Sequence, residues 1–123
     1  FRRIIFNGDL LTFADFNREH ERCLSFLKDA VSCSKARRKI VVTHHVPSFQ
    51  MQCPKFADSQ ANGAFTVELE EYIKNSGIDY WIFGHSHYNV DVKIGNTNCV
   101  SNQLGYVFHG DHESFNPGKY IEV

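Results

Sequence analysis

The stretch from Tyr80 to His87 places the tightest constraint on how this chain folds. It reads Tyr-Trp-Ile-Phe-Gly-His-Ser-His. Four large apolar or aromatic residues in a row are typical of a strand that is buried on both faces. Sites in open α/β sheets form where strands end at their carboxyl edge. The sequence therefore predicts that Gly84 permits a close backbone approach at such an edge, and that two imidazoles follow it there.

A second stretch has the same pattern. Ile40 to Thr43 is an apolar, β-branched run, and His44 and His45 follow it directly. A single histidine beside a strand is often a structural residue that makes a hydrogen bond. Four histidines at the ends of two strands favour a metal site, because neutral imidazole is a common ligand of zinc, manganese and iron.

The composition fits one domain without a nucleic-acid or membrane partner. The 123 residues are 42% hydrophobic and carry a net charge of −1, with no long run of either sign. No apolar run reaches the length of a transmembrane helix, and no signal peptide is evident. The four cysteines are scattered without a Cys-x-x-Cys pair, which favours free thiols in a reducing, cytoplasmic compartment. Because the chain begins at Phe1 and its only methionine is Met51, we expect it to be a fragment, an excerpt or a processed product.

The N-terminal third predicts a hairpin followed by a helix. Two apolar runs flank Asn7-Gly8, the usual centre of a two-residue hairpin turn. The alternative is that Gly8-Asp9 presents a metal-binding carboxylate, and the hairpin is the preferred interpretation. Apolar residues then recur at helical spacing behind Asp15, the expected N-cap. This helix is expected to run for about four turns and to end near residues 32–34.

The remainder of the chain predicts α/β layering with a mixed sheet. The loop over residues 48–63 is long enough to be a lid or a substrate wall. A helix over 65–73, with Thr66 as its cap, precedes the buried strand. A hairpin at 90–101 and a closing strand at 120–123 complete the expected elements.

Two blocks carry a resemblance to a known family. Residues 41–48 (Val-Val-Thr-His-His-Val-Pro-Ser) and then residues 84–87 resemble the last two signature blocks of the calcineurin-like metallophosphoesterase family. The predicted helices and the hairpin after the second block are similar to the family's C-terminal half, and residues 102–106 resemble an Asn-x-x-Gly-Tyr turn of one bacterial-type branch. The resemblance implies an α/β fold, namely the C-terminal half of a two-sheet sandwich with a mixed sheet and flanking helices. Residues 1–123 would form a single partial domain.

The same resemblance implies a hydrolase that cleaves phosphoesters at two divalent metal ions, which would be manganese, iron or zinc. His85 and His44 would bind one ion, and His87 the other. Strand register counted from Thr43 favours His44 as the ligand, whereas spacing back from the proline of the block favours His45. Both alternatives stay open, and His44 is preferred. His45 would then be the catalytic residue that protonates a leaving alkoxide or holds a phosphoryl oxygen.

The family's first three blocks are not all present. The chain contains no Asp-x-His and no Gly-Asn-His. A missing N-terminal half or a partner chain would supply the bridging Asp, and the 123-residue chain alone is expected to be inactive. A large apolar surface that includes Val41, Trp81 and Phe83 is then expected to be exposed, or to be covered by a partner chain. The polar cluster from His109 through Asp111 to His112 is interpreted as solvated rather than as a second metal site.

Two other functional classes stay open from the sequence. One is a binding scaffold that keeps the fold without its chemistry. The other is a structural domain whose single metal serves folding only, with a closed set of four ligands. A bound pair of metal ions would separate the enzyme from both.

Overall fold

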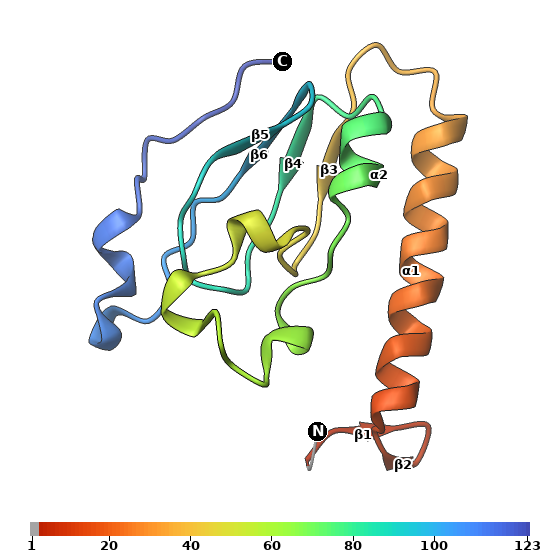
Figure 1. Ribbon diagram of the computed structural model, residues 1–123, viewed down its shortest axis with the longest axis vertical. Helices are drawn as coiled ribbons and strands as arrows, with labels where there is room; N and C mark the ends of the chain where they lie inside the picture. The colour runs from red at the N-terminus through yellow and green to blue at the C-terminus, as the bar shows by residue number, and fades with distance from the viewer. Residues whose placement is uncertain (1–2) are drawn as a thin grey trace. The chain divides into compact units, whose positions relative to one another are not determined.

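The computed structural model describes residues 3–123, and the chain divides after Lys35 into two compact units (Figure 1). The first unit holds a small hairpin and a long helix. The second holds a four-stranded sheet, a short helix and several 3-10 turns. Within the described residues, no helix combines the length and the apolar character needed to cross a bilayer.

The hairpin of the first unit confirms the prediction at Asn7-Gly8. Strand β1 (Ile5–Phe6) pairs antiparallel with β2 (Asp9–Leu10). The two turn residues have φ of +52° and +95°, as a two-residue turn with both central residues in the left-handed region requires. Asp9 is therefore a strand residue of this hairpin.

Helix α1 (Phe13–Cys33) begins earlier than the sequence predicts, and its 21 residues make it longer. Thr12 is the N-cap, since its hydroxyl accepts the N–H of Asp15 at 3.1 Å. The Asp15 carboxylate accepts the N–H of Thr12 in return, at 3.0 Å. The prediction of Asp15 as the cap is wrong because this residue is the reciprocal partner in a capping box. The predicted end is confirmed, with Ser34 as the C-cap.

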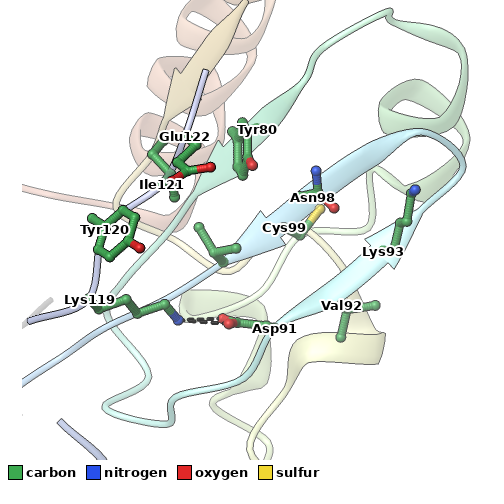
Figure 2. A pocket seen from close by; sticks show the side chains of 11 residues that line it. Tyr80, Asp91, Val92, Lys93, Asn98, Cys99, Lys119, Tyr120, Ile121 and Glu122 are labelled. Atoms are coloured by element: carbon green, nitrogen blue, oxygen red, sulfur yellow. Dashed lines mark hydrogen bonds and ion pairs between the residues drawn. The ribbon is translucent and has the colours of Figure 1, made fainter. Parts of the chain in front are cut away.

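The second unit contains a mixed sheet in the order β3-β4-β6-β5. Strands β3 (Ile40–Val42), β4 (Tyr80–Ile82) and β6 (Thr97–Val100) are parallel, and β5 (Val92–Ile94) is antiparallel to β6. This confirms the α/β class with a mixed sheet and the hairpin expected at 90–101. The closing strand predicted at 120–123 is wrong. The tail there is held instead through Lys119, whose ammonium group donates to Asp91 at 2.6 Å (Figure 2).

Helix α2 (Glu70–Asn75) is shorter than the predicted helix over 65–73. The prediction of Thr66 as its cap is wrong, because Thr66 forms a parallel bridge with Val46. The N–H of Val46 donates to the Phe65 carbonyl, and the N–H of residue 67 donates back to Val46, both at 3.0 Å. Because these hydrogen bonds hold residues 65–67 in an extended bridge, the helix starts only at residue 70. The helix ends at Asn75, with Ser76 as the C-cap.

The core of the second unit lies on one face of the sheet. Val41, Trp81 and Cys99 occupy one row across three strands, and all three are buried. Phe83 is also buried, so the expectation that Val41, Trp81 and Phe83 lie on an exposed surface is wrong. Side chains alternate between the faces of a strand, and the exposed apolar residues of β3 are the neighbours Ile40 and Val42.

The long loop between β3 and α2 is folded into three 3-10 turns, Phe49–Met51, Pro54–Phe56 and Asn62–Ala64. Met51 is fully buried, which anchors the first turn in the core. Ser48 caps that turn by accepting the N–H of Gln50. The loop is therefore an ordered wall of the second unit, and its last turn leads to Phe65.

Candidate functional site

The ends of strands β3 and β4 are joined by backbone hydrogen bonds up to the first histidine. Val42 pairs with Ile82 in the parallel register. Beyond the strands, the N–H of Thr43 donates to the Ile82 carbonyl at 2.9 Å, and the N–H of Gly84 donates to the His44 carbonyl at 3.1 Å. Because the two chains stay paired past their ladder, the histidines that follow emerge at one edge of the sheet.

Three of the four predicted site histidines come together at this edge. The ring centroids of His44 and His85 are 4.5 Å apart, those of His45 and His85 are 4.9 Å apart, and those of His44 and His45 are 5.3 Å apart. His44 is exposed, while His45 and His85 are half-buried. The cluster therefore presents imidazole groups from both loops to solvent.

The Gly-His-Ser-His loop is strained at its histidines. His85 and His87 have φ of +71° and +52°, in the left-handed region. Such a conformation costs a non-glycine residue about 1–3 kcal/mol and persists where surrounding contacts enforce it. The predicted role of Gly84 is not supported. A Cβ at that position would meet the His44 carbonyl oxygen at 3.6 Å, an ordinary contact.

Gln103 is the residue that enforces this loop conformation. Its Oε1 accepts the N–H of His87 at 2.9 Å. Its Nε2 donates to the Tyr88 carbonyl at 3.0 Å and to the Ser86 hydroxyl at 3.3 Å. One amide side chain thus holds three successive residues of the loop.

The surroundings of His85 favour its neutral form. Burial lowers the pKa of this imidazole, and the charges that His45, His44 and His87 would carry when protonated lower it further, whereas the hydrogen bond from the ring to the Ala64 backbone raises it. The Phe65 ring lies 4.6 Å from the His85 ring and contributes to the burial. A neutral imidazole has a lone pair available for a metal ion.

His87 is placed by different neighbours. Its Nδ1 lies 3.1 Å from Oδ2 of Asp111, and its ring packs edge-on against Tyr106 at 4.6 Å. Within residues 3–123, no three histidine, cysteine or acidic side chains are arranged to enclose a metal ion. The assignment of His44, His85 and His87 as metal ligands, and of His45 as the catalytic residue, stays a prediction. The donor chemistry of the cluster fits divalent metals, but its carboxylates are too few for a complete site.

Sequence reasoning missed the supporting residues of this site. Gln103, Tyr106 and Asp111 lie on the segment after β6, and only the Asn-x-x-Gly-Tyr pattern there gave any signal. The interpretation of Asp111 as solvated is wrong, because its carboxylate bonds to His87 and to the N–H of Tyr106. Phe65 was assigned to a helix and gave no signal of its place beside His85.

Comparisons with known proteins bear on this arrangement. The sequence model for calcineurin-like phosphoesterase matches residues 4–89, more than half of the chain. The uncharacterised protein L509 of Acanthamoeba polyphaga mimivirus is 28% identical over 120 residues, covering 92% of this chain and 41% of the relative. The chain thus spans about two fifths of the length of this curated relative. No solved structure matches the chain.

Proposed function

Because the chain belongs to the calcineurin-like phosphoesterase family, a membership that implies phosphoester hydrolysis, we propose that it contributes the histidine side of a dinuclear metal centre in such an enzyme. The observation that carries the proposal is the meeting of His44, His45 and His85 at the joined ends of β3 and β4. Their rings lie close enough to act on one substrate group.

Each histidine has a separate role in this proposal. His85 and His44 hold one divalent ion, manganese, iron or zinc, and His87 holds the second. His45 donates a proton to the leaving oxygen or holds a phosphoryl oxygen. The Thr43 hydroxyl donates to the His45 carbonyl at 3.0 Å, which steadies the backbone of this residue. Two bound ions supply Lewis-acid polarisation of the phosphoryl group and lower the pKa of a water molecule.

The ligand count makes the chain a half-site. Neither Asp-x-His nor Gly-Asn-His occurs in the sequence, and neutral imidazoles cannot offset the repulsion of two dications, which is about 4–17 kcal/mol at about 4 Å for effective dielectric constants from about 80 down to about 20. The proposal therefore treats residues 1–123 as the single C-terminal half-domain of a two-sheet sandwich. An N-terminal half or a partner chain supplies the remaining ligands. A cytoplasmic location is part of the proposal and rests on the scattered cysteines.

The test is hydrolysis of p-nitrophenyl phosphate and of bis-p-nitrophenyl phosphate with excess manganese. The 123-residue chain is assayed alone and after an upstream segment with the missing blocks is joined to it. We expect activity only in the joined protein, and its loss in the variants His85→Ala and His45→Ala. His20→Ala, on α1, is the matched control and retains activity. Turnover by the chain alone that His85→Ala abolishes would overturn the half-site argument.

The same protein distinguishes the two non-enzymatic classes. A folded, joined protein that binds no metal and cleaves neither ester would indicate a binding scaffold. One tightly held ion with four closed ligands would indicate a structural metal domain. Two ions per chain with turnover support the proposed enzyme.

A further inference from the structure

The His87 side chain is held by a segment that lies 24 residues further along the chain. Asp111 Oδ2 is 3.1 Å from His87 Nδ1, and the same oxygen accepts the N–H of Tyr106 at 3.0 Å. The Tyr106 ring packs against the His87 ring in an edge contact, with an interplanar angle of 81°. One carboxylate oxygen thus ties the imidazole to the turn that packs against it.

The backbone of this segment is shaped to admit the carboxylate. Gly105 has φ of +63°, and a Cβ on it would lie 2.4 Å from the Cβ of Asp111. Any other residue at position 105 would have to displace Asp111 and would also be strained. Gln103, from the same segment, fixes the N–H of His87. Residues 103–111 therefore constrain both the backbone and the ring of His87.

The contact with Asp111 selects one form of the imidazole. An ionised carboxylate only accepts hydrogen bonds, so Nδ1 must carry the proton. Asp111 Oδ2 already accepts the N–H of Tyr106 at 3.0 Å, so this oxygen acts as an acceptor toward both of its neighbours. The lone pair of a neutral His87 is then on Nε2, the nitrogen on the other side of the ring.

We propose that Asp111 is a positioning residue that locks His87 in the Nδ1–H form and so presents Nε2 to a divalent metal ion. The inference rests on the proposed function for the identity of the ligand, and on the described contacts for the lock itself. A carboxylate behind a ligating histidine fixes ring orientation and raises basicity, and its loss commonly lowers metal affinity by about 10–100-fold.

The lock is tested in the metal-free chain by the nitrogen-15 chemical shifts of the His87 ring at about pH 8, above the ordinary imidazole pKa. We expect a single Nδ1–H form in the wild-type chain and a mixture of both forms in Asp111→Ala. Gly105→Ala keeps the carboxylate but displaces it, and should give a mixture as well. The matched control is Asp91→Ala, which removes the exposed carboxylate that pairs with Lys119 (Figure 2).

The outcomes separate this inference from the function it rests on. A wild-type His87 with its proton on Nε2, or an Asp111→Ala spectrum identical to that of the wild type, would overturn the lock whatever the chain binds. A manganese titration of the joined protein then tests the consequence, with affinity expected to fall about 10–100-fold in Asp111→Ala and to hold in Asp91→Ala. An intact lock in a joined protein that binds no manganese would overturn both the metal role of Asp111 and the proposed function.

Discussion

The backbone N–H of Gly84 donates a hydrogen bond to the carbonyl of His44 at 3.1 Å. This contact lies beyond the last ladder pair of β3 and β4, and it joins the two loops that carry the site histidines. Beside it, the Trp81 indole N–H donates to the Thr43 hydroxyl at 2.9 Å. Thr43, the residue directly before His44, thus connects the site to the buried Trp81 of the core.

The Thr43–Trp81 bond gives a first prediction. Thr43→Val keeps the shape of the side chain but leaves the indole N–H of a fully buried Trp81 without this acceptor. An unsatisfied buried donor costs about 1–3 kcal/mol, so the free energy of unfolding should fall by that amount. Urea unfolding followed by tryptophan fluorescence measures it. The control is Thr66→Val, because the buried Thr66 hydroxyl has no partner among the residues described, and no destabilisation is expected.

The left-handed backbone at His87 gives a second prediction. His87→Ala and His87→Gly lose the same side-chain contacts, but only alanine is strained at φ of +52°. The glycine variant should therefore be more stable by about 1 kcal/mol in denaturant unfolding. Ser86 does not have a positive φ, so Ser86→Gly should be less stable than Ser86→Ala. Equal stabilities at position 87 would contradict the strain.

The carboxylate of Asp79 gives a prediction on pH. The Lys39 N–H and then the Arg38 guanidinium, at 2.8 and 2.6 Å, lower the pKa of the Asp79 carboxyl below its ordinary value of 3.8. Because folding lowers this pKa, the ionised carboxyl stabilises the folded chain above pH 3.8. That stabilisation is lost as the pH falls through the pKa that Asp79 has in the folded chain. Asp79→Asn should thus be less stable than the wild type at neutral pH, with a difference that shrinks in acid. Thermal unfolding across this range is the measurement, and Asp58→Asn is the control.

A fourth prediction concerns the reactivity of the cysteine thiols. Cys99 is buried, and burial raises its pKa to about 11, whereas Cys23 and Cys33 are exposed. Thiolate is the reactive form, so Cys99 should resist a thiol reagent at neutral pH in the native chain. Mass spectrometry after brief alkylation should find Cys23 and Cys33 modified first. Modification of Cys99 should appear only when denaturant unfolds the second unit. Early labelling of Cys99 in the native chain would show that the row across β3, β4 and β6 is open.

What the sequence determined about this protein is what local chemistry specifies. Asn7-Gly8 set its hairpin because both residues tolerate positive φ, and the apolar runs set β3 and β4 at the positions where they occur. The end of α1 near residues 32–34 could also be predicted from the sequence. The histidines could be identified as a group because strands of this kind end at a common edge.

Tertiary structure decided the features that depend on partners distant in the chain. Threonine often caps helices, yet the backbone of Thr66 pairs with Val46 in a β-bridge, and α2 starts only at Glu70. No local pattern states that Asp111 reaches His87 or that Gln103 holds its backbone. Hydrogen bonds across such separations form only after the sheet has brought its strands together, because short-range preferences fix dihedral angles and not which side chains meet.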